Sequence, residues 1–174
     1  MSELLSELLS TGGRSLEQEE VWLRSEARYK GGRGGILAID EICFCPYVFG
    51  RAIPPKFDAK LRFTLDGRRV GELAVTLGRK RFALILDHWK DEPRAALQED
   101  VDRLAKQKAE AFLLVLSANP CGQTESRMDL IDALPGVGPR TSVYRFSAET
   151  GQGEEYEFWV GAWPVARKRS GETL

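Results

Sequence analysis

An apolar strand, an amphipathic helix and a second apolar strand follow one another in the middle of this chain. The first segment, "RFALILDHW", ends at residue 89, and "FLLVLS" begins at residue 112. The helix expected between them, residues 93–111, carries one apolar stripe, with acidic residues early and basic residues late, as the helix dipole favours. Strands joined by such a crossover normally lie parallel, with a right-handed connection. This unit predicts a sheet with one parallel pair and a helix packed on it.

The segments before and after this unit extend the sheet. "ILAIDEICFCPYVF", "FDAKLRFTL" and "RVGELAVTL" precede it with the alternation of strands, separated by turns that suit hairpins. "SVYRFSAETGQGEEYEFWVGAW" follows as a closing hairpin with a Gly-rich turn. The expected fold class is therefore α/β (mixed α+β), with a central mixed sheet, an antiparallel meander and one crossover helix.

Two N-terminal helices are expected before the sheet. Leucines recur at helical spacing up to residue 9, and "TGG", residues 11–13, breaks that pattern. Ser15 and Gln18 then form a capping box for a second helix that ends near Gly31.

Length and composition predict one domain, residues 1–174, that resides in the cytoplasm. Its 174 residues are 43% hydrophobic and 29% charged, which suffices for one ordinary core. Its parts are expected to be N-terminal helices over 1–31, a sheet and helix core over 36–118, and a loop with the closing hairpin over 119–166. The sequence shows neither a secretory leader nor the ~20-residue apolar run of a membrane span. Because the chain has 25 basic and 26 acidic residues, its net charge does not attract nucleic acid, and any such binding must come from a local basic patch.

Over residues 15–118 the chain resembles the restriction-endonuclease-like PD-(D/E)XK nuclease superfamily. The resemblance depends on the element order and on three stretches: "EQEEVW" in a helix, "KFDAKLRF" in a strand presenting Asp58, and the "RFALILDHWKDE" strand with the helix and strand after it. It implies a nuclease-like sheet. In that family an Asp and a Glu hold Mg²⁺, while a Lys two residues past the Glu positions the attacking water.

The essential pair of that family is missing when "ILDHWKD" is aligned on its aromatic-Lys-Asp ending. Ile85 then takes the Glu position and Asp87 takes the Lys position. Pairing Asp87 with Lys90 instead requires a bulge, because side chains three apart on a strand point to opposite faces. The alternative catalytic set is Glu20, Asp58, Asp87 and Lys90, with Mg²⁺ held by Asp58 and Asp87.

The run "LPGVGPRT", residues 134–141, resembles the turn of a helix-hairpin-helix DNA-binding module. In that reading the backbone at Gly136 and Gly138 meets a phosphate, with Arg140 beside it. The following "RTSVYRFSAE" alternates like a strand, although the module needs a second helix there. The sequence therefore favours a helix that stops near Pro135, followed by a loop into a strand.

The remaining candidates have simpler structural interpretations. His88 is favoured as a hydrogen-bonded structural histidine over a general base or metal ligand. Cys43 and Cys45 are expected on one face of a strand and, with Cys121, as reduced thiols, because the C-x₂-C spacing of a zinc site is absent. Trp159 and Trp163 are expected in the core. The basic runs "GRRVG", "GRKR" and "ARKRS" are able to line up on one sheet edge and bind phosphates, but solvated turns are favoured.

The loss of the Glu-x-Lys pair favours a protein that does not catalyse, with no cofactor. The expected function is a protein-interaction module on a degenerate nuclease-like scaffold, a pseudoenzyme of the inhibitor, immunity or adaptor type whose partner is another protein. The alternative is a Mg²⁺-dependent nuclease or nucleic-acid-binding protein. Neither reading involves a membrane.

Overall fold

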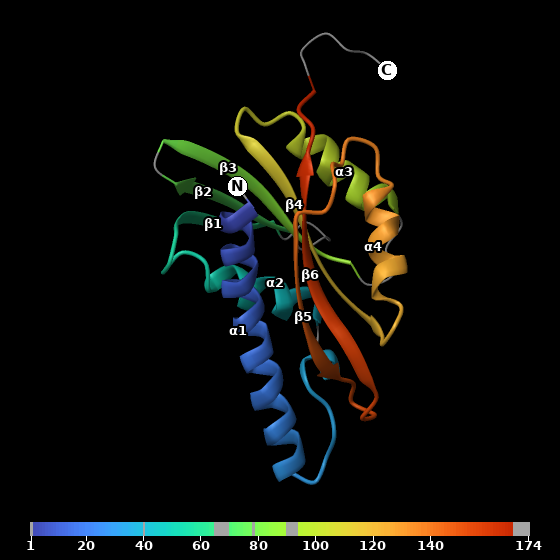
Figure 1. Cartoon of the computed structure of the whole chain (residues 1–174). Helices are drawn as coiled ribbons and strands as arrows, with labels where there is room; N and C mark the ends of the chain where they lie inside the picture. The colour runs from blue at the N-terminus through green and yellow to red at the C-terminus, as the bar shows by residue number, and fades with distance from the viewer. Residues whose placement is uncertain (1, 40, 65–69, 78, 90–93, 169–174) are drawn as a thin grey trace.

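A single mixed sheet contains all the strands that the computed structural model describes. The structure describes residues 2–39, 41–64, 70–77, 79–89 and 94–168. The helices are α1 (Ser2–Tyr29), a short 3-10 turn η1 (Ile36–Ala38), α2 (Glu41–Arg51), α3 (Arg94–Leu104) and α4 (Thr124–Asp132). The strands are β1 (Asp58–Thr64), β2 (Val70–Leu77), β3 (Lys80–His88), β4 (Glu110–Pro120), β5 (Ser142–Glu149) and β6 (Glu155–Val165). Figure 1 shows the elements in chain order by colour.

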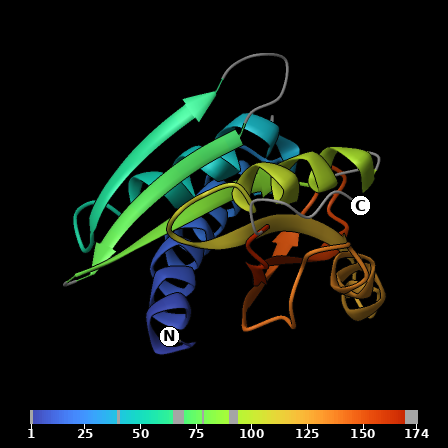
Figure 2. The same ribbon diagram turned by 90° about the horizontal axis from the view of Figure 1, so that it is seen from above.

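The sheet has six strands in the order β1-β2-β3-β4-β6-β5. β1, β2 and β3 form the predicted antiparallel meander, and α3 connects β3 to the parallel strand β4 as the crossover pattern predicted. β5 and β6 form the predicted closing hairpin, and β6 pairs antiparallel with β4. The sheet is strongly curled (Figure 2). The mixed α+β fold class is therefore confirmed.

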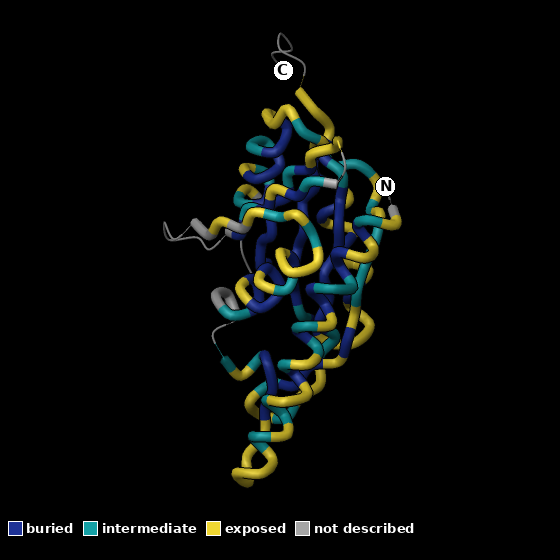
Figure 3. The backbone as a smooth tube through the Cα atoms, turned by 90° about the vertical axis from the view of Figure 1, so that its left-hand side faces the viewer, coloured by how far each residue is buried: buried dark blue, intermediate teal, exposed yellow. Residues whose placement is uncertain are grey.

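Helices cover both faces of this curled sheet and give it two apolar layers. α1 and α2 pack on the face that carries Leu84, Leu86 and Phe158. α3 and α4 pack on the opposite face, with Ile85 and Val115. The buried segments run through the middle of the molecule between exposed turns (Figure 3). Because successive residues of a strand point to opposite faces, parity decides which layer each side chain joins.

The expectation of two N-terminal helices is wrong, because α1 continues through the "TGG" run. At Gly12 an added Cβ would overlap the ring of Phe49, and at Gly13 it would overlap the ring of Tyr144. The two glycines therefore let α1 approach α2 and β5 closely, which offsets the roughly 1 kcal/mol that each glycine costs inside a helix. Ser15 lies inside this helix and caps nothing.

The expectation of a strand over "ILAIDEICFCPYVF" is also wrong, because this segment forms η1 and α2. Cys45, Val48 and Phe49 are buried at helical spacing against the α1 layer. Pro46 lies inside α2; a proline at that position also argues against an interior strand. Cys43 and Cys45 therefore do not share the face of a strand, and the side chain of Cys43 lies outside the described part.

The described helices include none with the length and apolar composition that a membrane span requires.

Candidate functional site

Glu20, the first candidate catalytic acid, is buried inside α1 and holds the surrounding backbone together. Its carboxylate accepts a hydrogen bond from the backbone N–H of Ile36, a second from the N–H of Glu149 at 2.9 Å, and a third from Nε of Arg24 at 2.8 Å. Only 2% of Glu20 is exposed. It therefore ties α1 to the start of η1 and to the end of β5, and its oxygens already serve architectural donors.

Charged neighbours complete this arrangement. Arg24 also pairs with Glu149 at 3.3 Å and with Glu155 at 3.7 Å. An added Cβ at Gly35 would overlap the Glu20 carboxylate, so the backbone of that residue approaches the carboxylate directly. These contacts explain why a glutamate is buried at position 20, which the nuclease resemblance gave a catalytic role.

The register of the sheet separates the two expected metal ligands. Asp58 pairs with Thr76, and Thr76 pairs with Arg81. Asp58 is therefore level with Arg81, six residues before Asp87 on β3. At ~3.3 Å per residue, the two aspartates lie roughly 20 Å apart along the strands. One cation with oxygen ligands at ~2.1 Å does not bridge that gap.

The acids also differ in environment. Asp58 is exposed, whereas Asp87 is 3% exposed. By strand parity Asp87 lies on the same face as Ile85, beneath α3 and α4, while Glu20 belongs to α1 on the other face. The structure therefore does not bring Glu20, Asp58 and Asp87 together. Lys90, the last member of the expected set, lies outside the described residues.

Within the described part of the chain, no group of three His, Cys, Asp or Glu side chains is arranged to hold a metal ion. Cys45 is buried in α2, whereas Cys121 is exposed after β4. His88 is 4% exposed and stacks on Phe158, with the ring centroids 6.4 Å apart. Cys45 is therefore a buried thiol, as predicted, and His88 is a buried ring that packs on an aromatic neighbour.

The "LPGVGPRT" run forms a loop between α4 and β5, as the strand-like sequence after it indicated. Gly136 adopts a φ of 83°, which favours glycine. The N–H of Gly138 donates to the carbonyl of Pro164 at 2.8 Å, and the N–H of Ala166 donates to the carbonyl of Gly136 at the same distance. Because a strand follows at Ser142, the second helix of a helix-hairpin-helix is missing.

Arg140, the third candidate of this run, is tied to its own domain. It pairs with Glu125 at 3.0 Å and with Asp132 at 3.8 Å, both on α4 or directly at its end. Hydrogen bonds from Arg145 and, as the second largest cause, from Arg140 lower the pKa of the Glu125 carboxyl. The loop therefore anchors α4 to the β5–β6 hairpin through the same residues that a DNA clamp would use.

Trp159 and Trp163 lie in the core, as predicted, and both are fully buried. Each indole N–H has a partner: Asn119 Oδ1 at 2.7 Å for Trp159 and Asp132 Oδ1 at 2.5 Å for Trp163. The rings meet edge to face at 6.3 Å. Both rings belong to the apolar layer between the sheet and helices α3 and α4.

A basic groove of about 690 Å³ lies where the β2–β3 turn meets the α3–β4 turn. Its exposed cationic side chains are Arg79, Lys80, Arg81, Lys106 and Lys108. Lys80 pairs with Glu110 at 3.7 Å. Among the residues the structure describes, no carboxylate lies within 4.0 Å of the other four cations. The groove is thus a concentrated positive charge on a protein of formal net charge −1.

An apolar pocket of about 280 Å³ adjoins this groove and shares the α3–β4 turn with it. Leu104 and Val165, which belong to the α3–α4 layer and are 2% and 8% exposed, line this pocket together with the cation Arg167. The chain after β6 is held there: Lys168 donates its N–H to the carbonyl of Ala105 at 3.1 Å.

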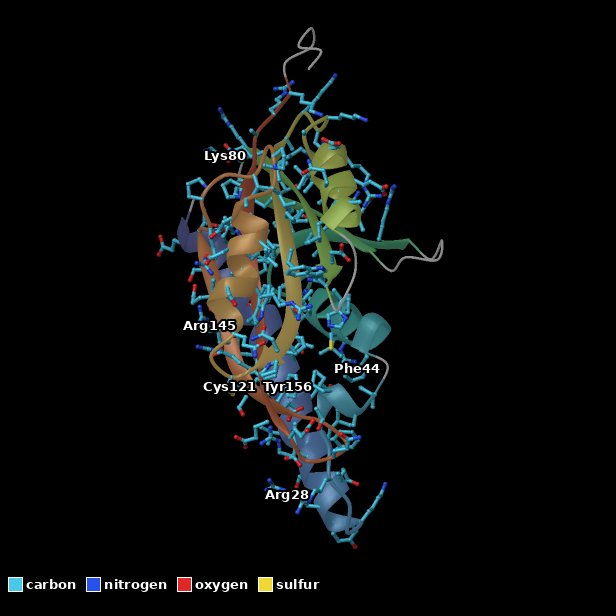
Figure 4. The ribbon with its side chains drawn as sticks, turned by 90° about the vertical axis from the view of Figure 1, so that its right-hand side faces the viewer. Arg28, Phe44, Lys80, Cys121, Arg145 and Tyr156 are labelled. Atoms are coloured by element: carbon cyan, nitrogen blue, oxygen red, sulfur yellow. The ribbon has the colours of Figure 1, made fainter. Side chains whose placement is uncertain are left out.

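A hydrogen bond from Lys168 Nζ, 2.9 Å long, holds the pKa of the Asp102 carboxyl below its usual range. This bond fixes the C-terminal segment against α3. Figure 4 shows Lys80 at the end of the molecule from which that segment leaves, far from Arg28 at the other end.

Sequence patterns indicated only part of this groove. The runs "GRKR" and "ARKRS" indicate basic edges of the sheet, whereas the helical pattern places "AKQK", residues 105–108, in the crossover helix. The helix ends at Leu104 instead, so Lys106 and Lys108 lie on the turn. The arginines of "GRRVG" lie outside the described residues.

No protein-family model matches the chain, and neither does a curated protein or a solved structure.

Proposed function

We propose that the protein is a non-catalytic protein-interaction module on a nuclease-like scaffold, of the inhibitor, immunity or adaptor type. The observation that carries this proposal is the placement of the acids. Glu20 is occupied by three structural hydrogen bonds, and Asp58 lies roughly 20 Å along the sheet from Asp87. A phosphodiester-cleaving site needs these oxygens around one cation.

The basic groove supports the binding part of the proposal. Five cations line this groove with one carboxylate, Glu110, and among the described residues four of them have no carboxylate within 4.0 Å. Like charges this close repel one another, so an anionic group that enters the groove is stabilised electrostatically. A partner that fills the apolar pocket beside the groove also removes apolar surface from water, which is the dominant favourable term in most protein association. The scaffold is thus suited to present a surface to a partner.

Two measurements test the proposed function together. The first is hydrolysis of DNA and RNA with Mg²⁺ or Mn²⁺ titrated in, comparing the wild type with Asp58→Ala. Asp58 is exposed, so this substitution leaves the fold intact. We expect no metal-dependent cleavage that the substitution abolishes. Cleavage by the wild type that disappears in Asp58→Ala, with equal folding of both proteins, refutes the proposal.

The second measurement is stoichiometric co-purification from the native cell extract, with and without nuclease treatment of the extract. We expect a partner protein that remains bound after the nucleic acid has been digested. If every co-purifying protein is lost on digestion, the protein binds nucleic acid rather than a protein partner, and the proposal fails.

A further inference from the structure

Four cations of the basic groove have no carboxylate within 4.0 Å among the residues that the structure describes, and they define the kind of ligand the groove accepts. Arg79, Arg81, Lys106 and Lys108 are all exposed. Arg79 and Arg81 belong to the β2–β3 turn and the start of β3, whereas Lys106 and Lys108 belong to the α3–β4 turn, so the fold brings together charges that are far apart in the sequence. Charges this close favour an occupant that carries several anionic groups.

The apolar pocket restricts that occupant further. Leu104, Phe112 and Val165 line a space of about 280 Å³ directly beside the α3–β4 turn. Filling such a space with an apolar side chain removes apolar surface from water on both partners. An occupant that carries only carboxylates does not bury apolar surface in this pocket and therefore binds without that contribution to the binding free energy.

Nucleic acid fits this combination less well than a protein segment does. Proteins that hold single strands stack bases on exposed aromatic rings, and none of the described residues that line the groove or the pocket carries an exposed aromatic ring. A duplex presents phosphates and has no apolar side chain for the pocket. The formal net charge of −1 also provides no long-range attraction for a polyanion.

We infer that the basic groove binds an acidic segment of a partner protein, with an apolar side chain of that segment in the adjoining pocket. This inference rests on the proposed interaction function and assigns it a surface and a partner chemistry. Carboxylates of the segment meet Arg81 and Lys108, and the apolar side chain contacts Leu104 and Val165.

The test uses a fluorescent seven-residue peptide of glutamates with one central leucine, followed by anisotropy at low salt. We expect saturable binding that weakens at least about tenfold in the double variant Arg81→Glu/Lys108→Glu. The matched control is Lys30→Glu/Arg33→Glu, which makes the same charge change on exposed residues just after α1. The end of α1, marked by Arg28 in Figure 4, lies at the opposite end of the molecule from Lys80. Circular dichroism verifies that both variants fold, and the control is expected to bind as the wild type does.

Two further arms, a second peptide and a DNA oligonucleotide, make the result decisive. A peptide with serine in place of leucine is expected to bind several-fold more weakly, because the pocket then stays unfilled. Equal loss of binding in both double variants, or no saturable binding up to about 1 mM peptide, overturns the inference. Tighter, variant-sensitive binding of a labelled DNA oligonucleotide overturns it in favour of nucleic acid.

The same variants separate this inference from the proposed function. If the native partner co-purifies equally with the wild type and with Arg81→Glu/Lys108→Glu, the groove inference fails while the interaction function stands. If the wild type retains no protein partner after nuclease digestion, the proposed function itself fails.

Discussion

Replacing Glu20 by alanine tests whether this buried carboxylate is architectural. The substitution leaves the backbone N–H groups of Ile36 and Glu149 without their acceptor, in a buried place between α1, η1 and β5. An unsatisfied buried donor costs about 1–3 kcal/mol, so two of them lower the free energy of unfolding by about 2–6 kcal/mol. That is a large part of the roughly 5–15 kcal/mol that stabilises an ordinary domain. Glu20→Gln keeps one acceptor oxygen and is expected to lose less.

Urea denaturation followed by tryptophan fluorescence measures this loss, because Trp159 and Trp163 are fully buried and report on global unfolding. The matched control is Glu26→Ala on the same helix, where an exposed ion pair with Lys30 is lost. Such a pair contributes about 0–1 kcal/mol. If Glu20→Ala destabilises no more than Glu26→Ala does, the architectural explanation of Glu20 is wrong and a functional role regains support.

Two more predictions follow from the α1 interface. Gly12→Val forces branched atoms into the ring of Phe49, so we expect a loss of about 2–3 kcal/mol in thermal or urea unfolding; Ser6→Val, exposed on the same helix, is the control, and equal stability of the two variants contradicts the close-approach argument. Burial, followed by the hydrogen bond to Glu17, raises the pKa of Tyr144 from 10.0 to about 12. A raised pKa contributes stability that is fully present below pH 10 and is lost as the pH rises toward 12. Stability measured across that window should fall more steeply in the wild type than in Tyr144→Phe, and parallel curves would count against the assignment.

The strands and the crossover could be predicted because their signals are local. The alternation in the segments that became β1, β2 and β3, with short turns between them, specifies hairpins. An amphipathic helix between two apolar strands leaves a parallel arrangement as the normal solution. Each of these features is encoded within a few neighbouring residues, so no distant contact was needed to interpret it.

The N-terminal third was harder to predict because distant contacts override local preference there. "TGG" looks like a helix break, yet Gly12 and Gly13 are where α1 passes close to Phe49 and Tyr144. The apolar residues of the "ICFCPYVF" run fit both the two-residue period of a strand and the 3.6-residue period of a helix. Packing against α1 and the meander selects the helix. Short apolar runs carry this ambiguity between helix and strand.

The sequence by itself determined the meander, the crossover and the final hairpin, because alternation and spacing are properties of adjacent residues. Only the tertiary structure decided what the candidate residues do. It placed Glu20 against two distant backbone N–H groups, set Asp58 on β1 six residues out of level with Asp87 on β3, and gathered cations from the β2–β3 and α3–β4 connections into the basic groove. The physical reason is that strand register and the docking of helices fix distances between segments far apart in the chain, and those distances determine which charges meet.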